Sequence, residues 1–207
     1  MLHQIVELTE LFDDGAAPID VIDDVLAALA AFSGMWLEST VRGPAWRFGD
    51  IGRRVERAIV SLALVRACVD VDTDDCDVVG AAALETLLGA CESLVAYRRT
   101  YRSDVERAPT LALLLHDRDN PRAVVSCIDR LAEHVADVDW ADGSVDVERL
   151  GALLGRVATA PTPGEALAVI ARLQEELDGF AGAIVERWFA TPVRPILVRA
   201  ETDVETS

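Results

Sequence analysis

Arginines, one glutamate and two aromatic side chains are concentrated between residues 42 and 57, which read RGPAWRFGDIGRRVER. Five of the chain's 19 cationic residues lie in this segment, and all 19 are arginine. Helical spacing places Arg53, Glu56 and Arg57 opposite an apolar stripe that begins at Ile51. Further along, this second face also becomes apolar, at Val60, Ala63, Leu64 and Ala67. A helix that is apolar all round is buried, so we predict that the three charged side chains are at least partly buried.

The charges of this segment do not balance. Glu56 can pair with Arg53 and lies beside Arg57, so two guanidinium groups share one carboxylate. A buried charge needs a partner, and the spare donors therefore require a further carboxylate, such as Asp50 or Glu38, or an anionic ligand. Two interpretations stay open: a closed structural ion-pair network, and a pocket for a carboxylate or phosphate.

Two further polar clusters follow, at 97–102 and 116–122. On a helix, Tyr97 and Tyr101 share one face, as do Arg98 and Arg102, either as a solvated helix end or as part of the same pocket. In the second cluster Asn120 can cap a helix that has Pro121 at its first position, with Arg122 in the first turn. A cation there is unfavourable beside the positive helix end, which indicates a carboxylate partner or an anion. The candidate network comprises Arg42, Trp46, Arg47, Asp50, Arg53, Arg57, Tyr97, Arg98, Arg99, Tyr101, Asp117, Asn120 and Arg122.

Several chemistries are disfavoured. The absence of lysine excludes a Schiff-base lysine and a Walker-type phosphate lysine. A net charge of −17 argues against non-specific nucleic-acid binding. The acidic loop 70–77 begins like a calcium loop but has Asp75 where glycine is needed and Ala81 where glutamate is needed. We predict no metal site, because the three histidines are dispersed, with His134 on the surface, and the cysteines lack metal-site spacing. Cys68, Cys91 and Cys127 are predicted to be small buried apolar residues.

Periodicity is helical almost throughout, with no alternating strand pattern, and 51% of the residues are hydrophobic. We predict an all-α fold: an antiparallel bundle of about six helices joined by short connections. The predicted long helices are 19–38, 46–69, 79–102, 120–138, 145–159 and 162–189, with a short one at 110–116. Thr162 and Glu165 form a capping box around Pro163 at the start of the sixth.

The length suits a single domain over 1–207, with 201–207 as a frayed polar tail. The first 20 residues lack the basic and apolar regions of a secretory signal. No apolar run reaches the length that a membrane span needs. We therefore expect a cytoplasmic protein without membrane association.

Three spaced motifs resemble the alpha-E domain family of all-helical bacterial proteins. The first is Gly34-Met35-x-x-Glu38 followed by Arg42-x-x-x-Trp46-Arg47-Phe48-x-Asp50-Ile51-Gly52-Arg53-Arg54-x-Glu56-Arg57-Ala58. The others are Tyr97-Arg98-Arg99-x-Tyr101 and Asp117-x-Asp119-Asn120-Pro121-Arg122-Ala123-Val124. The resemblance covers about residues 32–131.

The resemblance implies a role beside circularly permuted ATP-grasp proteins of amidoligase type and transglutaminase-like proteins, in peptide or amide-bond formation or peptide modification. ATP and magnesium are then expected only in the ATP-grasp partner, with no cofactor in this chain. Three functions remain open: an accessory or binding domain, a catalytic domain with Glu56 as general acid/base, and a structural bundle. A carboxylate between two arginines has a lowered pKa, which makes it a poor acid and a weak base.

Two departures from the family pattern bear on function. The family has a further Gly-Arg-x-x-Glu-Arg-Ala copy near its N-terminus, whereas only Gly52–Ala58 occurs here, so we expect this chain to match the C-terminal part of the domain. An apolar face left uncovered in this way would favour a homo-oligomer. Ala123 replaces the usual serine, which argues against a hydroxyl role at that position.

Overall fold

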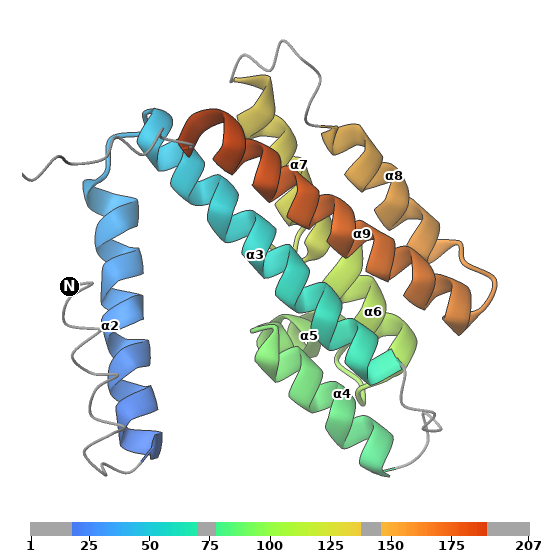
Figure 1. Cartoon of the computed structure of the whole chain (residues 1–207). Coiled ribbons are helices and arrows are strands. Elements are labelled where there is room, and N and C mark those ends of the chain that lie inside the picture. Colours follow the sequence, from blue (N-terminus) through green and yellow to red (C-terminus); the bar gives the residue numbers. More distant parts are fainter. Residues whose placement is uncertain (1–17, 70–77, 138–145, 190–207) are drawn as a thin grey trace, which may run out of the picture. The chain divides into compact units, whose positions relative to one another are not determined.

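A computed structural model describes residues 18–69, 78–137 and 146–189, and every element in these ranges is helical (Figure 1). The predicted all-α class is therefore confirmed. The predictions for the N-terminal 17 residues, the acidic loop 70–77, the start of a helix at 145, the end of another at 138 and the tail 201–207 fall outside the described residues.

Contacts divide the chain into two compact units, Met1–Asp50 and Ile51–Ser207. The boundary lies within one helix, α3 (Pro44–Val69). The prediction of one domain over 1–207 stays a prediction, and each unit is considered by itself.

The first unit contains α2 (Pro18–Ser39) and the first turns of α3. Pro44 opens α3 at a position where its missing N–H costs nothing. The rings of Phe32 and Trp36 lie 6.2 Å apart. On α2, Ile22, Leu26 and Leu29 are exposed, whereas Val21 is buried.

The second unit continues α3 and adds α4 (Val78–Ala90), α5 (Leu94–Tyr101), α6 (Arg107–Leu115), α7 (Val124–Ala136), α8 (Val147–Ala158) and α9 (Pro163–Ile184), followed by a π-helical turn, η1 (Val185–Phe189). Helix α9 packs against α8, and α8 packs against α7. Gln174 of α9 donates from Nε2 to the backbone oxygen of Ile59 on α3, over 3.3 Å. Figure 1 shows α3 and α9 side by side and antiparallel within this unit.

The core of the second unit is formed by apolar side chains at helical spacing. On α3 the buried stripe is Ile51, Val55, Ala58, Leu62 and Val65. The prediction that α3 is buried all round is wrong, since Val60, Ala63 and Ala67 on its other side are exposed. His134 is also buried rather than on the surface, because it follows Leu131 by three residues on the core-facing stripe of α7.

The predicted helix 79–102 is in fact two helices. α4 ends at Ala90 and α5 begins at Leu94, with Glu92 in the left-handed region at φ 51°. Ser93 N–H donates to Leu88 O over 2.8 Å, and Glu92 N–H donates to Gly89 O over 2.9 Å. This pairing is a Schellman motif, which usually has glycine at the left-handed position. A glutamate there gives no sequence signal for the break.

The predicted start of the fourth long helix is also wrong. α7 begins at Val124 after Ala123, and Asn120, Pro121 and Arg122 lie in the preceding turn. α6 starts at Arg107, three residues before its predicted start. By contrast, α9 begins as predicted: Pro163 is in its first turn, and Thr162 accepts a hydrogen bond from Glu165 N–H over 3.2 Å.

Candidate functional site

The loop 117–122 lies at the centre of the candidate site in the second unit. Asn120 is buried, and its side-chain amide donates to Ser93 Oγ and to the Leu113 backbone oxygen, each over 3.2 Å. The amide oxygen accepts from Arg122 N–H over 3.1 Å. Asn120 thus ties the loop to the α4–α5 turn and to α6, instead of capping α7.

Arg122 reaches the α4–α5 turn, where its guanidinium group forms an ion pair with the carboxylate of Glu92. The left-handed backbone at Glu92 sets the direction in which this carboxylate leaves the turn. The sequence predicted either a carboxylate partner or an anion for Arg122, and the structure pairs it with the carboxylate of Glu92, although Arg122 precedes α7.

Arg57 of α3 lies in an arginine cluster with Arg53, Arg54 and Arg122. Burial lowers the pKa of Arg57 from its ordinary value, and the positive charges of Arg122, Arg54 and Arg53 lower it further. The thiol of Cys127 raises the pKa of Arg57, an effect that requires the negatively charged thiolate. Arg57 is thus a half-buried cation among other cations, where an added anion would be strongly favoured.

Glu56 does not complete this cluster as predicted. Its side chain is exposed on α3, whereas Arg53 and Arg57 are half-buried as expected. The carboxylate of Glu92 pairs with the cluster at Arg122. The role of Glu56 as general acid/base stays a prediction.

Tyr97 and Tyr101 stack with ring centroids 4.8 Å apart. Tyr97 is buried, and its hydroxyl donates to Asp104 O over 3.0 Å and accepts from Glu106 N–H over 3.1 Å. These contacts make Tyr97 an anchor for the turn before α6. Burial raises the pKa of Tyr101, and the negative charge of Asp117 adds to the shift, which places Tyr101 near the 117–122 loop.

The remaining predicted site residues lie elsewhere. On α5, Arg98 and Arg99 are exposed, and Arg98 pairs with Glu85 over 3.4 Å. Arg42, Trp46, Arg47 and Asp50 belong to the first unit, where the Arg42 guanidinium lies 5.5 Å from the centre of the Trp46 ring and Asp50 is buried. Within the second unit, five of the predicted site residues therefore lie in the same site: Arg57, Tyr101, Asp117, Asn120 and Arg122. Glu92 and Ser93 also belong to this site. Both added residues lie within the helix predicted over 79–102, where no local signal marks them as site residues.

A hollow of 330 Å³ adjoins the loop on its α7 side. Its lining includes Arg54 of α3, Arg118 and Asp119 of the loop, and Asp129 of α7. Arg118 and Asp129 form an ion pair over 2.7 Å. Arg130 and Glu133 of α7 also line the hollow, so arginines and acidic side chains face it in equal number.

A separate cavity of 450 Å³ lies between α6 and the α8–α9 connection and is mostly apolar. His116, at the end of α6, lines it. Burial lowers the pKa of His116 below its ordinary value of 6.5. The neutral imidazole is therefore the form that the folded state prefers.

Replacing His116 with glutamine is expected to weaken the acid sensitivity of the fold. Because the folded-state pKa is below the unfolded one, the unfolded chain binds the proton first as the pH falls. The stabilisation by His116 is complete above its unfolded pKa and is lost as the pH falls from about 6.5 to the folded pKa. Urea denaturation at a series of pH values should therefore give a shallower decline for the variant below about pH 6.5. If stability declines equally steeply with falling pH in the variant and the wild type, His116 does not have a lowered pKa in the folded protein.

Within 18–69, 78–137 and 146–189 no group of histidine, cysteine, aspartate and glutamate is arranged to hold a metal ion. None of the helices described has the length and apolar character needed to cross a membrane. Cys91 and Cys127 are buried as predicted, and Cys68 is half-buried.

Comparison with known proteins identifies the family. The model of the Alpha-E family, described as a predicted alpha-helical domain with a conserved ER motif, matches residues 1–189. Glu56-Arg57 is the Glu-Arg pair within the motif that carried the resemblance, and the dipeptide also occurs at 106–107, 148–149 and 186–187. No solved structure matches the chain.

The curated relatives are uncharacterised mycobacterial proteins. One from Mycobacterium bovis and one from each of two Mycobacterium tuberculosis strains are 35% identical to this chain over 127 residues. The match covers 61% of this chain but 14% of each relative, so the chain spans a small part of their length. Since the family model covers most of its residues, the chain belongs to the Alpha-E family.

Proposed function

We propose that this chain is an accessory binding domain of a bacterial ATP-grasp-linked system that forms or modifies peptide or amide bonds. In this proposal, the arginine cluster of Arg53, Arg54, Arg57 and Arg122 binds an anionic group, either of a ligand or of the partner protein. Support comes from family membership together with the half-buried position of Arg57 among other cations. ATP and magnesium would bind to the ATP-grasp partner, and a transglutaminase-like protein is a further candidate partner.

The single observation that carries the proposal is the charge around Arg57. Its guanidinium group loses hydration on burial and is repelled by Arg122, Arg54 and Arg53. Glu92 offsets one positive charge, at Arg122. A carboxylate or phosphoryl group placed between Arg57 and Arg122 would relieve this repulsion and accept charge-assisted hydrogen bonds.

The test is a thermal-melt and calorimetry series with phosphate, glutamate and ATP with magnesium. A ligand that binds the folded state raises the melting temperature. Arg57→Ala is expected to weaken the binding of the active anion by about tenfold, the value of one partly buried charge-assisted hydrogen bond. Glu92→Gln is expected to strengthen the binding, because it removes the carboxylate that competes for Arg122.

Arg66→Ala serves as the matched control, since Arg66 is an exposed arginine on the same helix. Its binding should equal that of the wild type. Anion binding that is the same in Arg57→Ala and the wild type would exclude the cluster as the site. Binding that is weaker in Glu92→Gln would contradict the proposed competition.

A further inference from the structure

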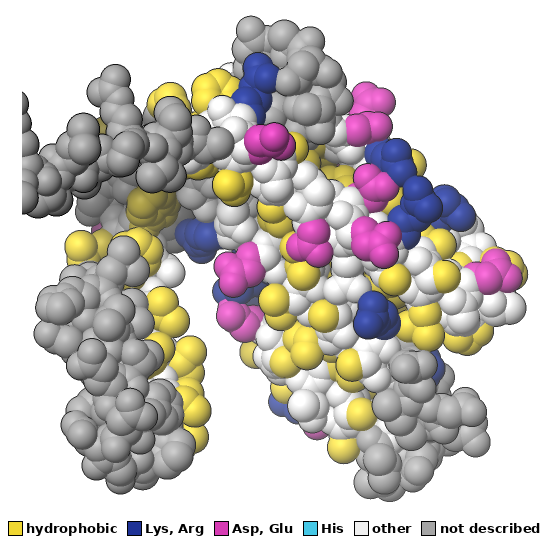
Figure 2. All heavy atoms as spheres, viewed as in Figure 1, with side chains coloured by type: hydrophobic (Ala, Val, Ile, Leu, Met, Phe, Trp, Pro, Cys, Tyr) yellow, Lys and Arg dark blue, Asp and Glu magenta, His cyan; other side chains and the backbone are white. Residues whose placement is uncertain are grey.

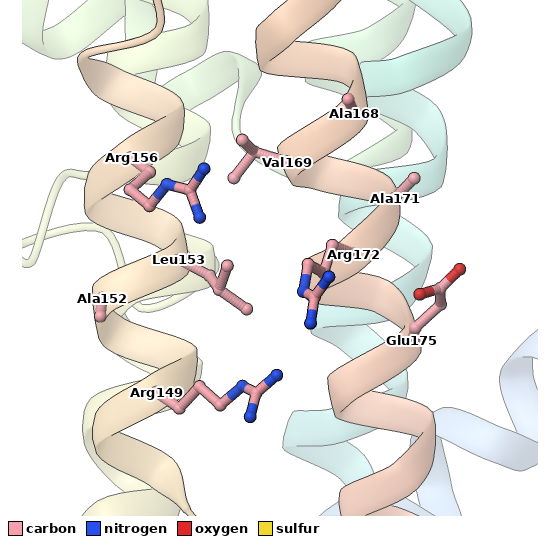
Figure 3. Close-up of a pocket in the computed structure, with 9 residues that line it drawn as sticks. All are labelled: Arg149, Ala152, Leu153, Arg156, Ala168, Val169, Ala171, Arg172 and Glu175. Atoms are coloured by element: carbon pink, nitrogen blue, oxygen red, sulfur yellow. The ribbon is translucent and has the colours of Figure 1, made fainter.

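A second concentration of arginine lies in the groove between α8 and α9, far along the sequence from the family motifs. The groove has a volume of 590 Å³. Figure 3 shows Arg149 and Arg156 of α8 pointing into it, together with Arg172 of α9 from the opposite wall. Figure 2 shows dark-blue arginine side chains gathered over α8 and α9 beside magenta carboxylates. This local concentration of arginine is unusual in a chain with a net charge of −17.

The arginines of the groove are unequally neutralised. Glu176 pairs with Arg149 over 2.6 Å and approaches Arg172 at 4.0 Å. Arg156 makes no ion pair with any residue that the structure describes. Glu175 also lines the groove, but in Figure 3 its carboxylate points away from α8. One end of the groove therefore already holds a carboxylate, and the other presents a guanidinium group to solvent.

The distance between the arginines determines how long a ligand must be to contact both ends of the groove. Arg149 and Arg156 are seven residues apart on α8, which corresponds to about 10 Å along the helix axis. Leu153 lies between them in Figure 3, with Val169 on the facing helix, so the middle of the groove is apolar. A single phosphate is too short to reach from one end to the other. A peptide in the polyproline II conformation has three residues per turn, so residues i and i+3 lie on the same face, about 9 Å apart.

We propose that the α8–α9 groove binds an acidic peptide segment in which two carboxylates, about three residues apart, flank an apolar side chain. One carboxylate binds Arg156, the apolar side chain covers Leu153 and Val169, and the second carboxylate binds Arg172 beside the Arg149–Glu176 pair. Charge complementarity with the arginines and the apolar floor between them together favour this occupant. The inference does not depend on the arginine cluster at Arg57, which lies on other elements.

The experiment is an NMR titration of the ¹⁵N-labelled full chain, with the arginine side-chain N–H signals observed. The probe is the capped hexapeptide Gly-Asp-Leu-Ala-Asp-Gly, compared with the same peptide carrying asparagine in place of both aspartates and with inorganic phosphate. We expect saturable shifts of the Arg156 and Arg172 signals with the acidic peptide. The neutral peptide should bind at least about fivefold more weakly, and added salt should weaken the acidic one.

Variants distinguish binding in the groove from general electrostatic attraction between the acidic peptide and the protein. Arg156→Gln is expected to weaken peptide binding about fivefold, the effect of one exposed ion pair, and Arg156→Glu should weaken it more. Arg66→Gln makes the same change of charge at an exposed arginine of α3, outside the groove, and should leave binding unchanged. Equal affinity of Arg156→Gln and the wild type would overturn the proposal. So would the absence of shifts, or phosphate shifting the groove signals at least as strongly as the peptide.

Discussion

Asn120→Ala is expected to lower the free energy of unfolding by about 2–4 kcal/mol, because it breaks two buried hydrogen bonds and a third that is part-buried. The Leu113 carbonyl would lose a partner at a buried position, and the Arg122 N–H would lose one at a part-buried position. Ser93 Oγ would lose less, since it also donates to Cys91 O over 3.0 Å. Urea denaturation followed by far-UV circular dichroism measures the change.

Two further variants make this result specific. Asn120→Asp keeps an oxygen that can accept from Arg122 N–H, but it removes both donated hydrogen bonds and places a negative charge in a buried position. Its cost at neutral pH should therefore be at least as large as that of Asn120→Ala. Asp119→Ala changes an exposed side chain in the same loop and should alter stability by less than about 0.5 kcal/mol. A similar small effect of Asn120→Ala would show that Asn120 does not hold the loop. Anion binding at the arginine cluster should weaken in Asn120→Ala, because the loop positions Arg122.

Gly49→Ala and Gly52→Ala are expected to change stability in opposite directions, although both lie in α3. A Cβ at Gly49 would lie 2.4 Å from Cζ2 of Trp36, within the first unit, whereas a Cβ at Gly52 meets nothing within 4 Å. The clash at Gly49 requires the indole ring to move, at a cost of about 1–3 kcal/mol. At Gly52 alanine simply favours the helix, by about 0.5–1 kcal/mol.

Denaturation of the two variants, with near-UV circular dichroism as a report on tryptophan packing, checks this contrast. A double-mutant cycle with Trp36→Ala isolates the clash, since Gly49→Ala should no longer destabilise once the indole is absent. If Gly49→Ala stabilises the chain as Gly52→Ala does, the close approach of Trp36 to α3 is not a feature of the folded protein.

Local chemistry was sufficient to predict most of the helices. Pro163 and the Thr162–Glu165 pair define the start of α9, and the Gly43-Pro44 break separates α2 from α3, because proline and capping residues act on the adjacent backbone alone. Apolar spacing likewise predicted the buried stripe of α3, since helical periodicity does not depend on the rest of the fold.

Predictions failed where distant contacts oppose a local preference. Asn120-Pro121 has the composition of a helix start, yet hydrogen bonds to Ser93 and Leu113 hold Asn120 in the loop instead. Glu92 adopts a left-handed backbone without glycine, and its carboxylate reaches Arg122 across the turn. Neither outcome follows from neighbouring residues alone, because Ser93 lies 27 residues from Asn120 and Arg122 lies still further from Glu92.

The sequence by itself determined the all-α class, the main amphipathic faces and the family, because periodicity, capping residues and motif spacing are properties of short segments. Only the tertiary structure decided which charges meet. It separated Glu56 from the arginine cluster, supplied Glu92 in its place, and brought Arg149, Arg156 and Arg172 together in one groove. Electrostatic pairing depends on the distance between side chains and on their burial, and both arise only when the helices pack.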